Sequence, residues 1–137
     1  MNRLKKVLGI VVLISLVSIL AVVILNPRLI NDWLALRGYT PSQRVSEIAD
    51  RTTMTDKARR VFYVYDPQIE GSDVFNQHCT IREVSIVLGC YDGTRIYVYD
   101  VADERLKGVQ EVTAAHEMLH AEYDRLSTGE RSRLFIV

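Results

Sequence analysis

Residues 112–126 read VTAAHEMLHAEYDRL, and their alanine, glutamate, methionine, leucine and arginine residues are typical of a strong helix former. We predict a helix over residues 109–126. Since successive helical residues are about 100° apart around the axis, four apolar side chains share one face. These are Val112, Ala115, Leu119 and Leu126. We expect this face to pack against the core of the domain.

Two histidines, His116 and His120, lie one helical turn apart beside the apolar face. Neutral imidazoles at positions i and i+4 can bind one zinc ion, and a carboxylate next to the first ligand can take a proton from metal-bound water. Glu117 has this position in the H-E-x-x-H motif. The sequence therefore predicts a Zn²⁺ site with His116 and His120 as metal ligands and Glu117 as the catalytic base.

The segment HEMLH follows the strand-forming segment IYVY of residues 96–99, and together they resemble the zincin superfamily of metallopeptidases. Segments FNQHC, VLGCY, RIYVYDV and TAAHEMLHAEYDRL, in this order after a membrane anchor, resemble a group of uncharacterised bacterial membrane-anchored zincin-like proteins. The resemblance spans residues 55–130. It implies zinc-dependent hydrolysis of peptide bonds, and it implies that residues 96–99 are the edge strand that holds an extended peptide substrate.

The third zinc ligand is not evident, because a catalytic site usually has three protein ligands and the motif supplies two. The metzincin extension requires glycine and histidine where this chain has Tyr123 and Leu126, so that subfamily is excluded. Glu130 is a candidate ligand, but the segment S-x-x-E at residues 127–130 also fits a capping box, in which Glu130 reaches back to Ser127. We favour the capping role.

Asp124 lies one turn beyond His120, but positions i, i+4 and i+8 span about 12 Å along a helix, which is too far for three ligands of one ion. We expect Asp124 to orient a histidine, or to form a surface ion pair with Arg125 or Arg131. His78 could approach the metal from a loop, although a histidine in a loop is more often simply solvated. The third ligand stays open.

Cys79 and Cys90 are the cysteines of the chain, and both lie in the part that we assign outside the membrane. Thiols in an oxidising compartment form disulfides, so a Cys79–Cys90 bridge is our first hypothesis. One straight strand between them would hold the Cα atoms too far apart, so the bridge requires the chain to bend near residues 80–83. Two buried free thiols, or Cys79 with His78 as a metal-ligand pair, are the alternatives.

The pattern of the remaining segments predicts an α+β domain. Asp92-Gly93 separates two strand-like segments and favours a tight hairpin. A short helix is predicted to start at residues 40–42 and to continue through residue 51, with Val45, Ile48 and Ala49 on its apolar face. The predicted strands are residues 61–65, 84–91 and 95–101, and residues 68–79 are predicted to form a loop.

Residues 7–25, VLGIVVLISLVSILAVVIL, contain no charge and are long enough to cross a hydrocarbon core about 30 Å thick. Arg3, Lys5 and Lys6 precede this segment, so the positive-inside rule places the N-terminus in the cytoplasm and the rest of the chain outside. The segment lacks the short apolar core and small-residue cleavage site of a cleaved signal peptide. We therefore predict a single-pass membrane anchor.

The expected organisation is a cytoplasmic N-terminus (1–6), a transmembrane helix (7–25), a juxtamembrane connector (26–40) and a zincin-like domain (41–137). We expect a membrane-anchored zinc metallopeptidase whose partners are the lipid bilayer and a peptide or protein substrate. The alternative is a non-catalytic or truncated zincin-like envelope protein, since the apolar residues 134–137 end the chain soon after a predicted helix start. The part of the chain assigned outside the membrane has 14 basic and 17 acidic residues. This charge balance does not favour binding of nucleic acid.

Overall fold

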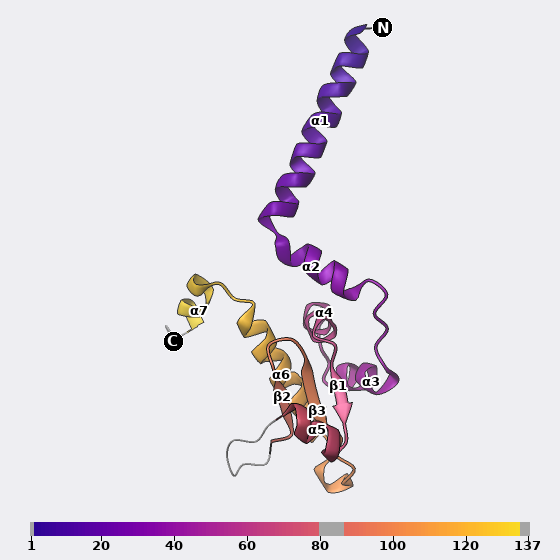
Figure 1. Ribbon diagram of the computed structural model, residues 1–137, viewed down its shortest axis with the longest axis vertical. Helices are drawn as coiled ribbons and strands as arrows, with labels where there is room; N and C mark the ends of the chain where they lie inside the picture. The colour runs from indigo at the N-terminus through magenta and orange to yellow at the C-terminus, as the bar shows by residue number, and fades with distance from the viewer. Residues whose placement is uncertain (1, 80–86, 135–137) are drawn as a thin grey trace. The chain divides into compact units, whose positions relative to one another are not determined.

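The computed structural model describes residues 2–79 and 87–134 (Figure 1). The chain forms two compact units, Met1–Arg37 and Gly38–Val137. In the described residues of the second unit, helices pack on both faces of a three-stranded sheet. The expected α+β character is confirmed.

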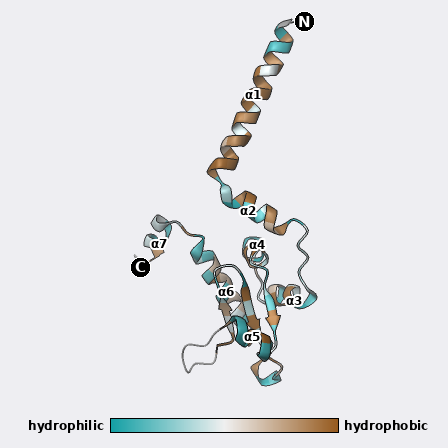
Figure 2. Cartoon of the chain, viewed as in Figure 1, coloured by the Kyte–Doolittle hydropathy of each residue, from teal (hydrophilic) through white to brown (hydrophobic). Residues whose placement is uncertain are grey.

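The first unit contains the helices α1 (Asn2–Leu25) and α2 (Pro27–Leu36). Helix α1 is mostly brown in Figure 2 beyond its hydrophilic N-terminal part, and its segment Arg3–Leu25 is long and apolar enough to cross a membrane. At about 1.5 Å per residue this helix exceeds the thickness of a hydrocarbon core. The expected connector is itself helical, because Pro27 starts α2 at a position where no backbone N–H is needed. The Arg37 guanidinium lies 5.3 Å from the Trp33 ring centroid.

The sheet of the second unit has the order β1-β3-β2, with strands β1 (Gln68–Glu70), β2 (Gly89–Tyr91) and β3 (Ile96–Tyr99). Strand β1 runs parallel to β3, and β2 runs antiparallel to it. The expected β2–β3 hairpin is confirmed: the Asp92 carboxylate accepts hydrogen bonds from the backbone N–H groups of Thr94 and Arg95, each at 2.7 Å. Gly93 takes the positive φ of 94° that the turn requires.

Alternate residues of β3 point to opposite faces of the sheet, and each face has its own core. On one side, Ile96 and Val98 pack with residues of α3 (Gln43–Arg51), α4 (Asp56–Val64) and α6 (Val109–Asp124). On the other side, Tyr97 packs with Phe75 of α5 (Ser72–His78) and with Cys79. Two further elements are η1 (Glu104–Leu106) and α7 (Thr128–Leu134). Strand β3 is therefore central to the domain.

Helix α3 confirms its prediction closely. Ser42 caps it by accepting a hydrogen bond from the backbone N–H of Val45 at 3.3 Å, and the expected apolar face is buried. That face comprises Val45, Ile48 and Ala49.

The predicted strand at residues 61–65 is wrong, because Val61 to Val64 form the second half of helix α4. Thr55 caps this helix by accepting the Ala58 N–H at 3.3 Å, and Val61 and Phe62 are then buried in the core shared with α6. A cap and tertiary burial thus outweigh the strand propensity of β-branched and aromatic residues.

The segment 68–79, predicted as a loop, contains both β1 and α5. The predicted strands 84–91 and 95–101 correspond to the shorter strands β2 and β3. Residues 80–86, which include the expected bend between the cysteines, lie outside the described residues.

The Cys79–Cys90 disulfide is confirmed, with Cα atoms 5.9 Å apart. It joins the C-terminal end of α5 to β2. Both cysteines belong to the core on the α5 face of the sheet, and the Cys79 side chain is buried. The covalent bond therefore adds a link to α5 for a strand that also pairs with β3 and packs against α6. The alternatives of free thiols and of a Cys79 metal ligand do not hold.

Replacing both cysteines by serine is expected to lower the free energy of unfolding by about 3 kcal/mol, because the bridge limits the entropy of the unfolded chain. Urea unfolding of the full chain in detergent micelles, followed by near-ultraviolet circular dichroism of the tyrosines, would measure it. A reducing agent should weaken the native chain and leave the double variant unchanged. Equal midpoints for the two proteins would contradict the expectation.

Candidate metal centre

Helix α6 packs on the sheet through a different face from the one expected. Val112 and Leu119 are 72% and 61% exposed, and Ala115 and Leu126 are half-buried, so the stripe predicted as core is not the buried face of the helix. The buried apolar residues of α6 are Ala114, Met118 and Ala121. Small side chains bring the helix axis close to β3, which the large residues of the other face could not allow. Hydropathy alone favoured the wrong face because it weights Val and Leu above Ala.

This orientation turns both histidines outward on adjacent turns of α6. The His116 and His120 rings are nearly perpendicular, with an interplanar angle of 82°. Their Nε2 atoms lie 2.9 Å apart. Two nitrogens bound tetrahedrally to one zinc at about 2.0–2.1 Å are separated by about 3.3 Å. The Nε2–Nε2 distance is thus a few tenths of an ångström shorter than the separation of two zinc ligands.

Glu117 lies between the histidines in sequence but is only 8% exposed. Burial raises the pKa of its carboxyl group, while His120, His116 and a hydrogen bond from the Tyr91 backbone act in the opposite direction. The burial effect is the largest of these causes. The structure thus holds a carboxyl group at the edge of the sheet, beside two imidazoles, where it binds a proton more readily than a solvated glutamate.

Gly89 of β2 allows this close approach between strand and helix. A Cβ atom at this position would clash with Thr113 Cγ2 and would lie 3.0 Å from Glu117 Cγ and 3.1 Å from the Tyr97 carbonyl oxygen. Only glycine leaves room for α6 at this point. The sequence analysis did not single out Gly89. The available signal was a glycine inside a predicted strand, which often marks the close approach of another element.

Two hollows flank the histidines. One, of about 420 Å³, lies between β2 and α6 and is lined by Gly89, Cys90, Tyr91, Glu117, His120, Tyr123 and Asp124. The other, of about 360 Å³, is mainly apolar and is lined by His116, Leu119, His120 and Tyr123. His120 and Tyr123 line both, so these two side chains form the boundary between a hollow that contains the carboxyl group and one that is apolar.

The edge strand is β2 rather than the segment implied by the resemblance. Residues 96–99 form β3, which pairs with strands on both sides. Within the described residues, β2 forms the sheet edge that adjoins Glu117. The second strand of the hairpin, β3, lies between β2 and β1, so residues 96–99 are not at the edge of the sheet.

Glu130 has the capping role that we favoured. Its carboxylate accepts hydrogen bonds from Ser127 N at 2.8 Å and Ser127 Oγ at 2.7 Å. The Ser127 Oγ in turn accepts the Glu130 N–H at 3.4 Å, which completes the capping box of α7.

Asp124 and His78 are engaged elsewhere. The Asp124 carboxylate lies 3.8 Å from the Arg131 guanidinium, one of the two surface pairs expected. His78 stacks on Tyr97 at 4.4 Å and contacts the Glu70 carboxylate at 2.9 Å. Since Tyr97 belongs to the α5 face of the sheet, His78 lies on the opposite face from α6. Among residues 2–79 and 87–134, no group of three His, Cys, Asp or Glu side chains could hold a metal ion.

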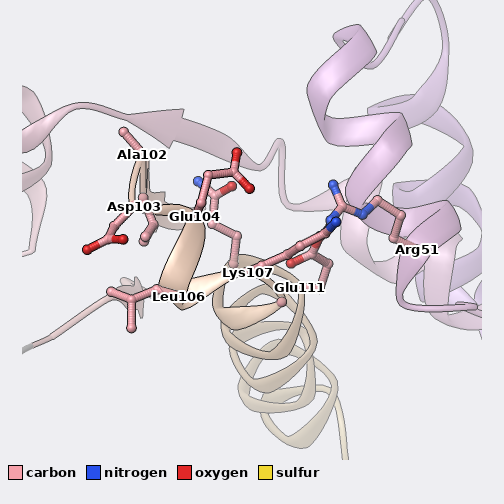
Figure 3. Close-up of a pocket in the computed structure, with 10 residues that line it drawn as sticks. Arg51, Ala102, Asp103, Glu104, Leu106, Lys107 and Glu111 are labelled. Carbon is pink, nitrogen blue, oxygen red and sulfur yellow. The ribbon is translucent and has the colours of Figure 1, made fainter.

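The N-terminal end of α6 borders a separate hollow of about 500 Å³ (Figure 3). Figure 3 shows Arg51 reaching from α3 toward Glu111, and their charged groups are 2.8 Å apart. Glu111 is 9% exposed, so this ion pair neutralises a carboxylate on the buried face of α6. This hollow contains none of the residues of the histidine motif, and its ion pair serves to fix α6 against α3.

Comparison with known proteins adds no assignment: no family model matches the chain, and neither curated proteins nor solved structures give a significant match.

The replacement Gly89→Ala is expected to destabilise the domain by about 1–3 kcal/mol, because the new methyl group overpacks the contact between β2 and α6. Thermal unfolding of the full chain in micelles would measure the loss. The double replacement Gly89→Ala with Thr113→Ser should recover part of it, since it removes the clashing Thr113 methyl group. Gly71→Ala is the matched control, because Gly71 has a φ of −71° and open space around its Cα. Equal losses for both alanines would contradict this account.

The replacement Glu117→Gln is expected to stabilise the metal-free chain at about pH 8 and to have little effect at about pH 4. The folded-state pKa of Glu117 is raised, so the carboxyl group destabilises the fold as the pH rises above its unfolded value of 4.5. Below that value both states are protonated and the difference vanishes. Thermal midpoints with a chelator present, compared at both pH values, test this. A variant that is less stable than the native chain at the higher pH would refute it.

Proposed function

We propose that this chain is a membrane-anchored, zinc-dependent peptidase with His116 and His120 as metal ligands and Glu117 as catalytic base. The observation that carries the proposal is the convergence of the two Nε2 atoms to 2.9 Å beside the buried carboxyl group of Glu117. Three side chains suited to these roles in zinc hydrolysis thus lie together on helix α6. A bound zinc ion would supply Lewis-acid polarisation of a water molecule and of the substrate carbonyl group.

The role of Glu117 follows from its surroundings. A general base must lie within reach of the attacking water and must accept a proton readily, and burial raises the pKa of this carboxyl group. Glu117 removes a proton from the attacking water, and its protonated form then donates that proton to the departing amine. The hydrogen bond from the Tyr91 backbone fixes the carboxyl group during both transfers.

Strand β2 can hold the substrate backbone beside Glu117. Its ladder hydrogen bonds, Tyr99 N to Leu88 O at 2.8 Å and Asp92 N to Arg95 O at 3.2 Å, alternate along the hairpin. In this alternation the backbone groups of Gly89 and Tyr91 point away from β3. The Tyr91 N–H is directed to Glu117, and the Gly89 groups are positioned to pair with an extended peptide by strand addition.

Helix α1 is the proposed membrane anchor. Arg3, Lys5 and Lys6 precede its apolar part, which favours a cytoplasmic N-terminus and an extracytoplasmic domain. The Cys79–Cys90 disulfide supports this orientation, because such bonds persist in oxidising compartments. The substrates would then be extracytoplasmic peptides or protein segments that can adopt an extended conformation.

The test compares the full native chain with Glu117→Gln in detergent micelles, with zinc content and hydrolysis of a mixed peptide library as readouts. We expect zinc binding by both proteins and an activity loss of about 10²–10⁴-fold in the variant, the usual contribution of a general base. His116→Ala should lose zinc and activity together. The surface variant Glu104→Gln is the matched control and should behave as the native chain. Zinc-dependent hydrolysis that survives intact in Glu117→Gln would refute the role of Glu117 as base. A zinc-loaded native chain that cleaves no peptide would favour a non-catalytic envelope protein.

A further inference from the structure

We propose that Tyr123 supplies the third protein ligand of the metal ion, through its phenol oxygen. This inference rests on the metal half-site formed by His116 and His120. It goes beyond that site because it assigns the ligand that neither the motif nor the acidic residues provide.

The position of Tyr123 on α6 suits this role. Tyr123 lies three residues after His120 and seven after His116, or about 4.5 Å and 10.5 Å further along the helix axis. At about 100° per residue it lies within about 20° of His116 around the helix. Long side chains on a helix lean toward its N-terminus, so the phenol group can reach back toward the turn that carries His120. Asp124 points in a more distant direction and has a much shorter side chain.

The hollows place Tyr123 next to the histidines independently of this geometry. The two cavities that flank the motif have two residues in common, and these are His120 and Tyr123. The cavity that contains Glu117 also contains Tyr123, whereas Glu130 lines neither of them. Both imidazoles and Tyr123 line the apolar hollow, and His120 and Tyr123 also line the hollow that contains Glu117, so an ion held by the two imidazoles would lie beside the tyrosine.

Arg131 holds the Tyr123 ring in place. Its guanidinium lies 4.8 Å from the ring centroid and donates hydrogen bonds to the Asp124 carbonyl at 2.9 Å and the Leu126 carbonyl at 3.2 Å. Helix α7 thus places the Arg131 guanidinium against the C-terminal end of α6. A positive charge beside the ring offsets part of the negative charge that a phenolate ligand brings to the site.

The chemistry of the ligand set is balanced. Binding of the phenol oxygen to a divalent cation releases one proton to solvent, as metal binding does for other ligands that must be deprotonated. Two neutral imidazoles and one phenolate leave a net charge of plus one and an open coordination position. Three protein ligands with one open position is the arrangement that catalytic zinc sites require.

The experiment uses the full chain in micelles with two probes, Zn²⁺ in competition with a chelator and Cu²⁺ followed by visible absorption. Tyr123→Phe keeps the ring and its Arg131 contact but removes the oxygen. We expect zinc affinity to fall by about 10–100-fold or more, since even the loss of an outer-shell partner has an effect of this size. We also expect the native chain to show a phenolate-to-copper charge-transfer band that the variant lacks.

Two controls separate the possible failures. Tyr99→Phe removes a phenol oxygen on the α5 face of the sheet, and His78→Ala removes a histidine on the same face. Neither should change affinity or the absorption band. If His116→Ala abolishes metal binding while Tyr123→Phe binds zinc as the native chain does and no charge-transfer band is present, the tyrosine ligand is wrong and the half-site stands. If the native chain and His116→Ala bind zinc equally, the half-site and the tyrosine ligand both fail.

Discussion

The close contact between helix α6 and the β2–β3 hairpin is the constraint on which the rest of the domain depends. Ala114 and Ala121 face the sheet from the helix, and Gly89 faces the helix from β2. Because these residues have little or no side chain, the helix backbone approaches the strand closely enough to bury the Glu117 carboxyl group. A larger residue at any of the three positions would separate the two elements and admit water to that carboxyl group.

The same contact gives α6 two faces with different tasks. Its inner face contains small apolar residues together with Glu111 and Glu117, and its outer face carries His116, His120 and Tyr123. Ion pairs from neighbouring helices fix the orientation, with Arg51 of α3 at 2.8 Å from Glu111 and Lys57 of α4 at 3.0 Å from Glu122. Rotation of the helix would break the ion pair that neutralises the buried Glu111. Packing on the opposite side therefore sets the direction of the imidazoles.

Features with a local cause could be predicted from the sequence, and features decided by tertiary packing could not. The hairpin depends on Asp92-Gly93, the start of α3 on Ser42, and the α7 cap on Ser127 and Glu130, so all three follow from neighbouring residues. The prediction of a strand at residues 61–65 was wrong because burial of the VFYV segment against α6 overrides its strand propensity. The prediction of the buried face of α6 was wrong because hydropathy favours Leu119 over Ala121, whereas close packing against the sheet selects the smaller side chain.

The alternation of side chains along β2 has a consequence for how the protein matures. Gly89 and Tyr91 face α6, whereas Cys90 and its partner Cys79 lie in the core on the α5 side. The disulfide therefore closes on the face of the sheet opposite α6. Its formation in an oxidising compartment ties β2 to α5 without displacing the contact between Gly89 and helix α6.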